Sequence, residues 1–208
     1  MKLYHYPISP NSRRVVAVLH HLNLACELHA LDLMKGEHLQ PDFLQLNPNH
    51  MIPTLVDGEI VLWESNAILH YLCSKVANTT LSASEPSLQA DILRWQFWQT
   101  GHFGTACGIF IFENVIKKFR QLGEADAAEL AKGIEKFRRF ADVLEAHLTG
   151  RDWLVADRLT LADFSVGSYF DLAAMAGYPM DGYVEIPRWY SVIEQLPAWQ
   201  SSAPKNFL

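Results

Sequence analysis

The fold of this chain is decided by its opening stretch, Leu3-Tyr-His-Tyr-Pro-Ile-Ser-Pro-Asn-Ser-Arg-Arg-Val-Val-Ala-Val-Leu19. Residues 2–6 are typical of a short β-strand. Pro7 and Pro10 then end any regular pairing, because proline has no N–H to donate to a sheet. The apolar residues that follow recur at three- and four-residue spacing, which indicates an amphipathic helix. The stretch therefore predicts a strand that feeds directly into the N-terminus of a helix.

The turn between this strand and this helix is suited to an anion. We expect the helix to begin at Asn11 or Ser12, since both residue types are good N-caps, and Arg13 and Arg14 to lie on its solvent side. Unpaired backbone N–H groups and the positive end of the helix dipole converge at such a place. The hydroxyls of Ser9 and Ser12 and the amide of Asn11 are close by in sequence, so a thiolate would be stabilised there.

Composition places the chain among ordinary soluble globular proteins. It has 208 residues, of which 50% are hydrophobic and 19% charged, enough for one large domain or two small ones. The net charge is −6 and the basic residues are scattered, which argues against nucleic acid or an anionic membrane surface as a partner. We expect neither a signal peptide nor a membrane-spanning segment, because no apolar run is long enough.

The cysteines are three, and Cys26, Cys73 and Cys107 form no close pair in the sequence. This spacing excludes a C-x-x-C redox site and a cysteine-based zinc site, so we expect no metal. None of the three falls at the start of the first helix, where a catalytic cysteine would be needed. Unpaired apolar thiols fit a reducing compartment, and we expect a cytoplasmic protein.

The first 77 residues alternate between strand and helix patterns. After the first helix the sequence predicts a strand over 25–33, a short helix over 41–46, strands over 54–57 and 60–63, and a helix from Glu64-Ser65. The last two strands are joined by Asp57-Gly58, a hairpin signal. The resulting order, βαβαββα, predicts a small mixed sheet covered by helices.

The remaining residues carry no strand pattern. Residues 78–86, rich in Ser, Thr and small residues, are typical of a linker. Residues 88–118 then form one long, aromatic-rich helical pattern that its glycines could interrupt, and 123–148 form another. Thr160-Leu-Ala-Asp163 has the form of a capping box, in which the aspartate is structural. We therefore expect an all-helical second domain.

Four motifs of this chain, in this order, resemble cytosolic glutathione transferases of the serine type. They are Tyr6-Pro-Ile-Ser-Pro-Asn-Ser-Arg-Arg-Val15, Asn47-Pro-Asn-His-Met-Ile-Pro-Thr-Leu55, Leu62-Trp-Glu-Ser-Asn-Ala-Ile68 and Thr160-Leu-Ala-Asp-Phe164. The likeness spans most of the chain and is to the bacterial, phi, theta and nu kinds of that superfamily. It implies a thioredoxin-like glutathione-binding domain over residues 1–77, a linker over 78–86, and an all-helical domain over 87–208 with a pocket for an electrophile.

By this resemblance Ser9 is catalytic: its hydroxyl donates a hydrogen bond to the sulfur of glutathione and holds it as a thiolate. Asn11 matches an asparagine that works alongside the serine in some bacterial relatives, so both are candidate catalytic residues. The residues alone leave open that Ser9 only caps a turn. Ser12 is more simply the helix N-cap, and Arg13, which resembles a basic residue of the family, is equally well explained as a solvated cation.

The resemblance also assigns the rest of the glutathione-binding site. Met51, Ile52 and Pro53 match a segment with a cis-proline, in which the residue before the proline pairs through its backbone with the cysteinyl part of glutathione. Glu64 and Ser65 match the pair that binds the γ-glutamyl end: the glutamate takes the ammonium, and the serine with the free helix N–H groups takes the carboxylate. A simple N-cap pair is the alternative and is compatible with this role.

His38 and Leu39 match a polar pair that helps to bind the glycyl carboxylate in relatives. Leu39 departs from the lysine often found there, so we expect a weaker or differently held glycyl end. We assign the second-substrate pocket to Ile8, His102 and Phe103. Most other aromatic residues of the long helix are expected to be packing residues.

The expected activity is that of a glutathione transferase, with glutathione as co-substrate, a small hydrophobic electrophile as second substrate, and no cofactor. Two alternatives remain open. One is another glutathione chemistry on the same fold, such as disulfide or peroxide reduction, and the other is a non-enzymatic binding protein that kept the fold. Relatives are homodimers, and we expect the same here, with no nucleic acid and no membrane as partners.

Overall fold

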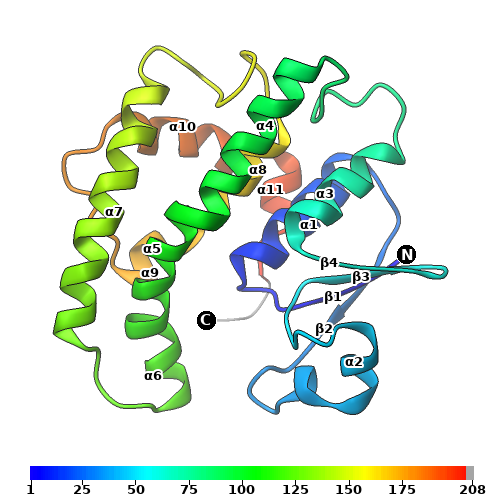
Figure 1. Cartoon of the computed structure of the whole chain (residues 1–208), viewed down its shortest axis with the longest axis horizontal. Helices are drawn as coiled ribbons and strands as arrows, with labels where there is room; N and C mark the ends of the chain where they lie inside the picture. Colours follow the sequence, from blue (N-terminus) through cyan, green and yellow to red (C-terminus); the bar gives the residue numbers. More distant parts are fainter. Residues whose placement is uncertain (205–208) are drawn as a thin grey trace. The chain divides into compact units, whose positions relative to one another are not determined.

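The chain folds as two compact units. The structure is a computed structural model, and it describes residues 1–204. Residues 1–79 together with the segment from Gln195 onward form the first unit, and residues 80–194 form the second (Figure 1). The expected C-terminal domain covers residues 87–208, whereas residues 195–204 group with the first unit.

The first unit is built on a four-stranded sheet with the strand order β2-β1-β3-β4. β2 runs parallel to β1, β3 runs antiparallel to β1, and β4 runs antiparallel to β3. This mixed sheet is the one that the sequence predicts. The strands are β1 (Lys2–His5), β2 (Glu27–Ala30), β3 (Thr54–Asp57) and β4 (Ile60–Trp63).

Helices cover both faces of this sheet. α1 (Pro10–His21) and α3 (Ser65–Ser74) pack against each other on one side, and α2 (Pro41–Leu46) lies on the other, preceded by the short η1 (Glu37–Leu39) (Figure 1). Side chains from the central strands, such as Leu55, are fully buried in the core. The order βαβαββα confirms the thioredoxin-like fold class.

The first helix begins earlier than expected, and its two arginines are buried. Its first residue is Pro10 and its N-cap is Ser9, so it starts before the predicted Asn11. Proline is favoured at this position, because the N–H that it lacks would have no partner within the helix. Arg13 and Arg14, expected on the solvent side, are only 7% and 1% exposed, so that expectation is wrong.

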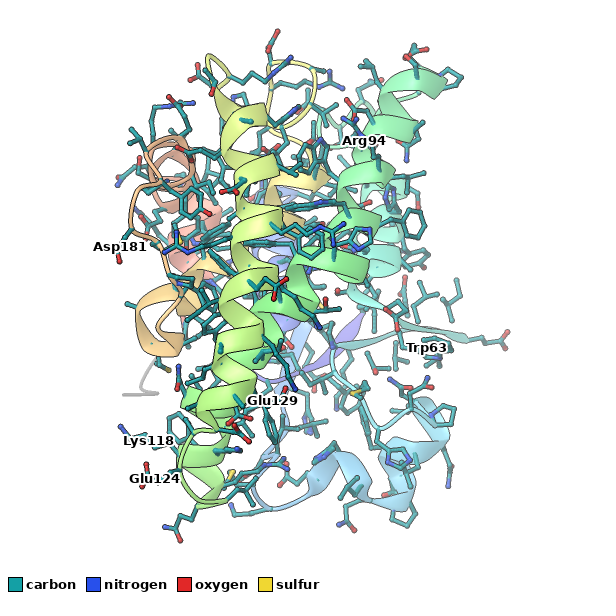
Figure 2. All side chains as sticks on the ribbon, turned by 60° about the vertical axis from the view of Figure 1, so that its left-hand side comes forward. Trp63, Arg94, Lys118, Glu124, Glu129 and Asp181 are labelled. Carbon is teal, nitrogen blue, oxygen red and sulfur yellow. The ribbon has the colours of Figure 1, made fainter. Side chains whose placement is uncertain are left out.

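The second unit is all helical, as predicted, and charged side chains such as Lys118 and Glu124 point outward from it (Figure 2). A further short helix, α11 (Pro197–Ser201), follows in the first unit. The helices of the second unit are α4 (Pro86–Trp98), η2 (Gln99–Phe103), α5 (Gly104–Phe110), η3 (Ile111–Ile116), α6 (Lys117–Arg120), α7 (Ala127–Leu148), α8 (Leu161–Gly167), η4 (Phe170–Leu172), α9 (Ala173–Ala176) and α10 (Glu185–Glu194).

The long pattern predicted over 88–118 is one continuous helical run from α4 to α6. Two π-helical segments, η2 and η3, lie within it in place of breaks. Gly104 makes the first of them possible, because its N–H bonds the carbonyl oxygen of Gln99. A Cβ at Gly104 would lie 2.5 Å from Nε2 and 2.7 Å from the carbonyl oxygen of Gln99. Only glycine therefore allows this close turn.

Asp163 organises the start of α8, as the capping box predicts. Its carboxylate accepts hydrogen bonds from Thr160 N at 2.8 Å, Thr160 Oγ1 at 3.0 Å, Leu154 N at 3.0 Å and Trp189 Nε1 at 3.1 Å. Burial raises the pKa of Asp163 to about 6, against the opposing effect of these hydrogen bonds. With this pKa the carboxyl is mostly ionised at neutral pH, the form that accepts all of these bonds.

Replacing Asp163 by alanine should lower the free energy of unfolding by about 3 kcal/mol or more, because several buried donors lose their acceptor and each costs about 1–3 kcal/mol when unpaired. Asp163→Asn keeps one acceptor oxygen and should cost less. Denaturant unfolding of the three proteins measures both differences. A loss below about 1 kcal/mol in Asp163→Ala would show that these bonds do not hold the helix.

Candidate functional site

Ser9 lies where β1 ends and α1 begins. Its backbone is extended, with φ −72° and ψ 125°, and its Oγ accepts a hydrogen bond from Ser12 N at 3.4 Å, which makes it the N-cap. A hydroxyl has one donor and two acceptor positions, so capping leaves the O–H of Ser9 free to donate elsewhere. The residue is partly exposed. The capping role and the catalytic role of Ser9 are therefore compatible.

Ser12 does not cap the helix, contrary to expectation. Its side chain is fully buried, and its Oγ accepts a hydrogen bond from Tyr6 N at 3.2 Å. It therefore closes the turn between strand and helix and is not accessible to a ligand. Asn11 is partly exposed in the same first turn, which leaves Asn11 as the accessible polar neighbour of Ser9.

The N-terminal end of α1 has the electrostatics of an anion site. Pro10 contributes no N–H, and the N–H of Arg13 is bonded to the carbonyl oxygen of Ser9 at 2.8 Å. The first turn contains no acidic residue that would oppose the positive end of the helix dipole. The N–H of Asn11 and the hydroxyl of Ser9 are thus the donors best placed for an anion.

The loop before β3 carries the cis peptide bond that the resemblance implies, between Ile52 and Pro53. Met51 is 67% exposed, Ile52 is partly exposed, and Pro53 is buried. Within residues 1–204, no other backbone group bonds the N–H or the C=O of Ile52. The loop therefore offers backbone groups, and not a reactive side chain, to a ligand.

Asn47 holds this loop in shape, a role that sequence reasoning missed. It is fully buried, and its Nδ2 donates to the carbonyl oxygen of Met51 at 2.9 Å and to Thr54 Oγ1 at 3.0 Å. Its Oδ1 accepts from Asn49 N at 3.0 Å. The Asn-Pro dipeptide after a short helix was the only signal in the sequence, and it indicates a turn without showing which side chain organises it.

Glu64 and Ser65 lie at the N-terminus of α3. Glu64 has φ 70° and ψ 107°, is exposed, and makes no capping hydrogen bond. Glutamate rarely adopts a positive φ, so the backbone is strained here, which is common where a binding site fixes it. Ser65 is 8% exposed, and Arg14 Nη1 lies 3.5 Å from its Oγ and 3.2 Å from Asn66 Oδ1. The simple N-cap alternative therefore fails for Glu64.

His38 and Leu39 lie in η1, on the same side of the sheet as α2. The helix follows Gly36, whose φ of 72° is readily adopted by glycine. His38 is half-buried, and Leu39 is 50% exposed. Leu39 has no polar side-chain group, so only His38 of this pair can contact a carboxylate through its side chain.

Phe103 does not line an open pocket, contrary to expectation. It is fully buried and stacks on Trp98, with ring centroids 5.3 Å apart and planes inclined by 7°. The rings of Phe137 and Phe170 each lie 5.3 Å from it as well. Phe103 is therefore a core residue of the second unit.

His102 and Ile8, the other residues assigned to the second-substrate pocket, are accessible. His102 is exposed on η2, and its ring stacks on Phe140 at 5.2 Å. Ile8 belongs to the first unit, next to Ser9 in sequence, and is half-buried. Each is thus open to a ligand within its own unit.

The thiols lie outside the α1 N-terminus. Cys73 and Cys107 are buried and Cys26 is half-buried, and burial raises the pKa of the Cys107 and Cys26 thiols.

In the part of the chain that the structure describes, no group of His, Cys, Asp and Glu could hold a metal ion. The described helices include none that is both long and apolar enough to cross a membrane.

Comparisons with known proteins agree with this arrangement. Models of the glutathione S-transferase N-terminal domain and C-terminal domain match residues 3–80 and 104–197. Glutathione S-transferase 3 from Zea mays is 35% identical over 97% of this chain and 92% of its own length, and the probable glutathione S-transferase GSTF2 from Oryza sativa subsp. japonica is 31% identical over 98% and 95%. The crystal structure of glutathione transferase F7 from Populus trichocarpa has a TM-score of 0.88 at 29% identity, covering 97% of this chain and 96% of that one. The chain belongs to the glutathione S-transferase family.

Proposed function

We propose that this protein binds glutathione through its first unit and transfers it to a small hydrophobic electrophile. The observation that carries the proposal is the Ser9 hydroxyl, an N-cap whose O–H is free to donate, at a helix end without an acidic first turn. The thiol proton passes to solvent, the thiolate forms a sulfur–carbon bond with the electrophile, and the leaving group departs with its electron pair. The protein supplies a formed thiolate and proximity.

A hydroxyl and a helix N-terminus are sufficient for this task. A free thiol has a pKa of about 8.5, so little of it is ionised at neutral pH. Lowering that pKa by about two units requires nearly 3 kcal/mol. One hydrogen bond to a charged group contributes about 1.5–3 kcal/mol, and the helix end adds about 0.3–1 kcal/mol. No general base is needed.

The other parts of glutathione have matching groups in the same unit. The free backbone groups of Ile52 support pairing with the cysteinyl residue. The exposed carboxylate of Glu64 supports contact with the γ-glutamyl ammonium, and Ser65 with the α3 N-terminus supports contact with its carboxylate. His38 is the group best suited to the glycyl carboxylate. Asn11 is proposed as a second donor to the sulfur.

Transfer is favoured over reduction through a protein thiol. The N-cap of α1 is a serine, so it cannot form a mixed disulfide with glutathione. Cys73 and Cys107 are buried, and burial raises the pKa of the Cys107 thiol, which makes it a poor nucleophile. These observations disfavour reduction through a protein thiol, whereas transfer to an electrophile needs no such thiol.

We further propose that the protein is a cytoplasmic homodimer. β4 is an edge strand, and its apolar residues Ile60, Val61 and Trp63 are 44%, 38% and 43% exposed; Trp63 can be followed in Figure 2. A second copy of the chain covering this edge strand would remove its unpaired backbone groups and apolar side chains from water. The buried free thiols Cys73 and Cys107 support a reducing compartment.

Ser9→Ala should raise the pKa of the bound glutathione thiol and slow turnover at neutral pH by about 10- to 100-fold, because a charge-assisted hydrogen bond worth about 1.5–3 kcal/mol is lost. Ultraviolet titration of the bound thiolate measures the pKa. Ser9→Thr keeps both the hydroxyl and the cap, and should retain most of the activity. An unchanged pKa in Ser9→Ala would transfer the role to Asn11.

Glu64→Gln should weaken glutathione binding by about 10- to 100-fold and leave kcat nearly unchanged, because the γ-glutamyl ammonium is remote from the reacting sulfur and contributes equally to ground state and transition state. Isothermal calorimetry and steady-state kinetics measure the two effects. The control is Glu59→Gln, which removes an exposed carboxylate from the turn between β3 and β4. It should change neither the affinity for glutathione nor kcat. Unchanged affinity in Glu64→Gln would remove this residue from the site.

Asn47→Ala should raise KM for glutathione more than it lowers kcat, since the loop that presents Ile52 loses the amide that fixes its shape. The buried amide should also cost about 1–3 kcal/mol of stability when lost. The matched control is Asn49→Ala, which removes one hydrogen bond to Asn47 Oδ1 but leaves the bonds of Asn47 to Met51 and Thr54 in place. Calorimetry with glutathione decides the matter: equal affinities in the two variants would show that Asn47 only stabilises the fold.

A further inference from the structure

Arg13 ties the first turn of α1 to the C-terminal helix α11. Its Nε donates to Ser202 Oγ at 3.2 Å, and its Nη2 donates to the carbonyl oxygen of Trp199 at 3.2 Å. The guanidinium also lies over the Trp199 ring, 4.7 Å from the centroid. Because the side chain is only 7% exposed, these contacts are largely removed from water. Buried hydrogen bonds of a charged group are stronger than exposed ones.

A second polar contact joins α1 and the α11 segment further along α1. His20 Nδ1 and Ser201 Oγ are 2.7 Å apart, at the opposite end of the helix from Ser9. At 3.6 residues per turn, the two ties are about two turns apart. The C-terminal segment is therefore hydrogen-bonded to α1 both in the turn that carries the N-cap, through Arg13, and near the opposite end, through His20.

The turn that Arg13 holds is the turn that presents Ser9 and Asn11. The N–H of Arg13 donates to the carbonyl oxygen of Ser9 at 2.8 Å, which is the first intrahelical bond of α1. Pro10 cannot donate such a bond, so on its helical side the turn is held by the N–H groups of Ser12 and Arg13, while Ser9 N bonds the carbonyl oxygen of Tyr6 at 2.9 Å on its strand side. Any rotation of Arg13 about the helix axis would move the N-cap hydroxyl with it.

We propose that Arg13, seated on Trp199 and Ser202, is a positioning residue for the glutathione thiolate. It fixes the position of the first turn of α1 and thereby orients the Ser9 hydroxyl toward the sulfur. Its permanent charge adds to the positive end of the helix dipole. A planar guanidinium can donate to a carbonyl, donate to a hydroxyl and stack on an indole at once, whereas an ammonium cannot. The inference rests on the proposed function.

The experiment compares wild-type protein with Arg13→Lys, which keeps the charge and loses the planar fork. The bound glutathione thiolate is titrated by ultraviolet absorbance, and kcat and KM are measured across pH. Arg13→Lys should raise the thiolate pKa by about 0.5–1 unit and lower kcat at neutral pH by about 3- to 10-fold, with recovery at higher pH. A loss of stability alone would not produce a pH-dependent kcat.

His20→Ala is the matched control, because it breaks the distal tie between the same two segments. It should lower the melting temperature slightly and leave the thiolate pKa unchanged. Ser202→Ala is the second test variant, which removes one acceptor and keeps the arginine, and should shift the pKa in the same direction by a smaller amount. This variant keeps the proposal testable if Arg13→Lys does not fold.

The outcomes separate this inference from the proposed function. A wild-type protein that does not bind glutathione would contradict the proposed function. If the wild-type protein lowers the thiolate pKa and both Arg13→Lys and Ser202→Ala show that same pKa, the positioning role of Arg13 is overturned and the proposed function stands. Equal thiolate pKa shifts in His20→Ala and Arg13→Lys would also overturn the positioning role. The shift would then come from loosening α11 against α1 in general and not from Arg13 itself.

Discussion

The candidate site depends on one constraint: a strand must end and a helix must begin within a few residues, without using the groups that a ligand needs. Tyr6 N donates to Ser12 Oγ at 3.2 Å, and Ser9 N donates to the carbonyl oxygen of Tyr6 at 2.9 Å. The carbonyl oxygen of Ser9 then accepts the first helical bond, and Pro10 has no N–H to satisfy. What remains is the O–H of Ser9 and the N–H of Asn11, both at the positive end of α1.

The proposed glutathione site also uses the backbone groups of Ile52, in a loop that a buried side chain holds in place. Ile52 offers its N–H and C=O, and nothing in its own side chain explains this role. The side chain that matters is Asn47, which is fully buried and bonds both ends of the loop, at Met51 and Thr54. A loop residue that acts through its backbone tolerates a change of side chain. The buried Asn47 amide does not, because its loss removes the donor shared by Met51 and Thr54 and the acceptor of Asn49 N.

The sequence predicted the order of the elements and the position of the turn, because hydrophobic periodicity, prolines and capping residues are local signals. Predictions from the sequence were wrong where contacts with residues distant in the chain determine whether a side chain is buried. Arg13 has its acceptors at Trp199 and Ser202, so no local pattern could show that it is buried. Phe103 is the last residue of the π-helical segment η2, and the extra residue in such a turn changes which side chains face the core. The cis bond before Pro53 came only from resemblance, since trans is the usual state.

Two neighbouring arginines, Arg13 and Arg14, are buried in the first unit, and removing their charges from water costs free energy. The proposed binding of an anionic ligand accounts for this cost. Removing a guanidinium from water is unfavourable by several kcal/mol unless its N–H groups are bonded, and apolar residues would often be more stabilising in the same space. The acceptors around Arg13 and Arg14 include neutral ones, which satisfy N–H groups without cancelling charge: the Trp199 carbonyl, Ser202 Oγ, Ser65 Oγ and Asn66 Oδ1. Positive charge is thus kept near the N-termini of α1 and α3, where the thiolate and the γ-glutamyl carboxylate are proposed to bind. A bound anion offsets part of that cost, so glutathione affinity and the stability of the first unit are thermodynamically linked.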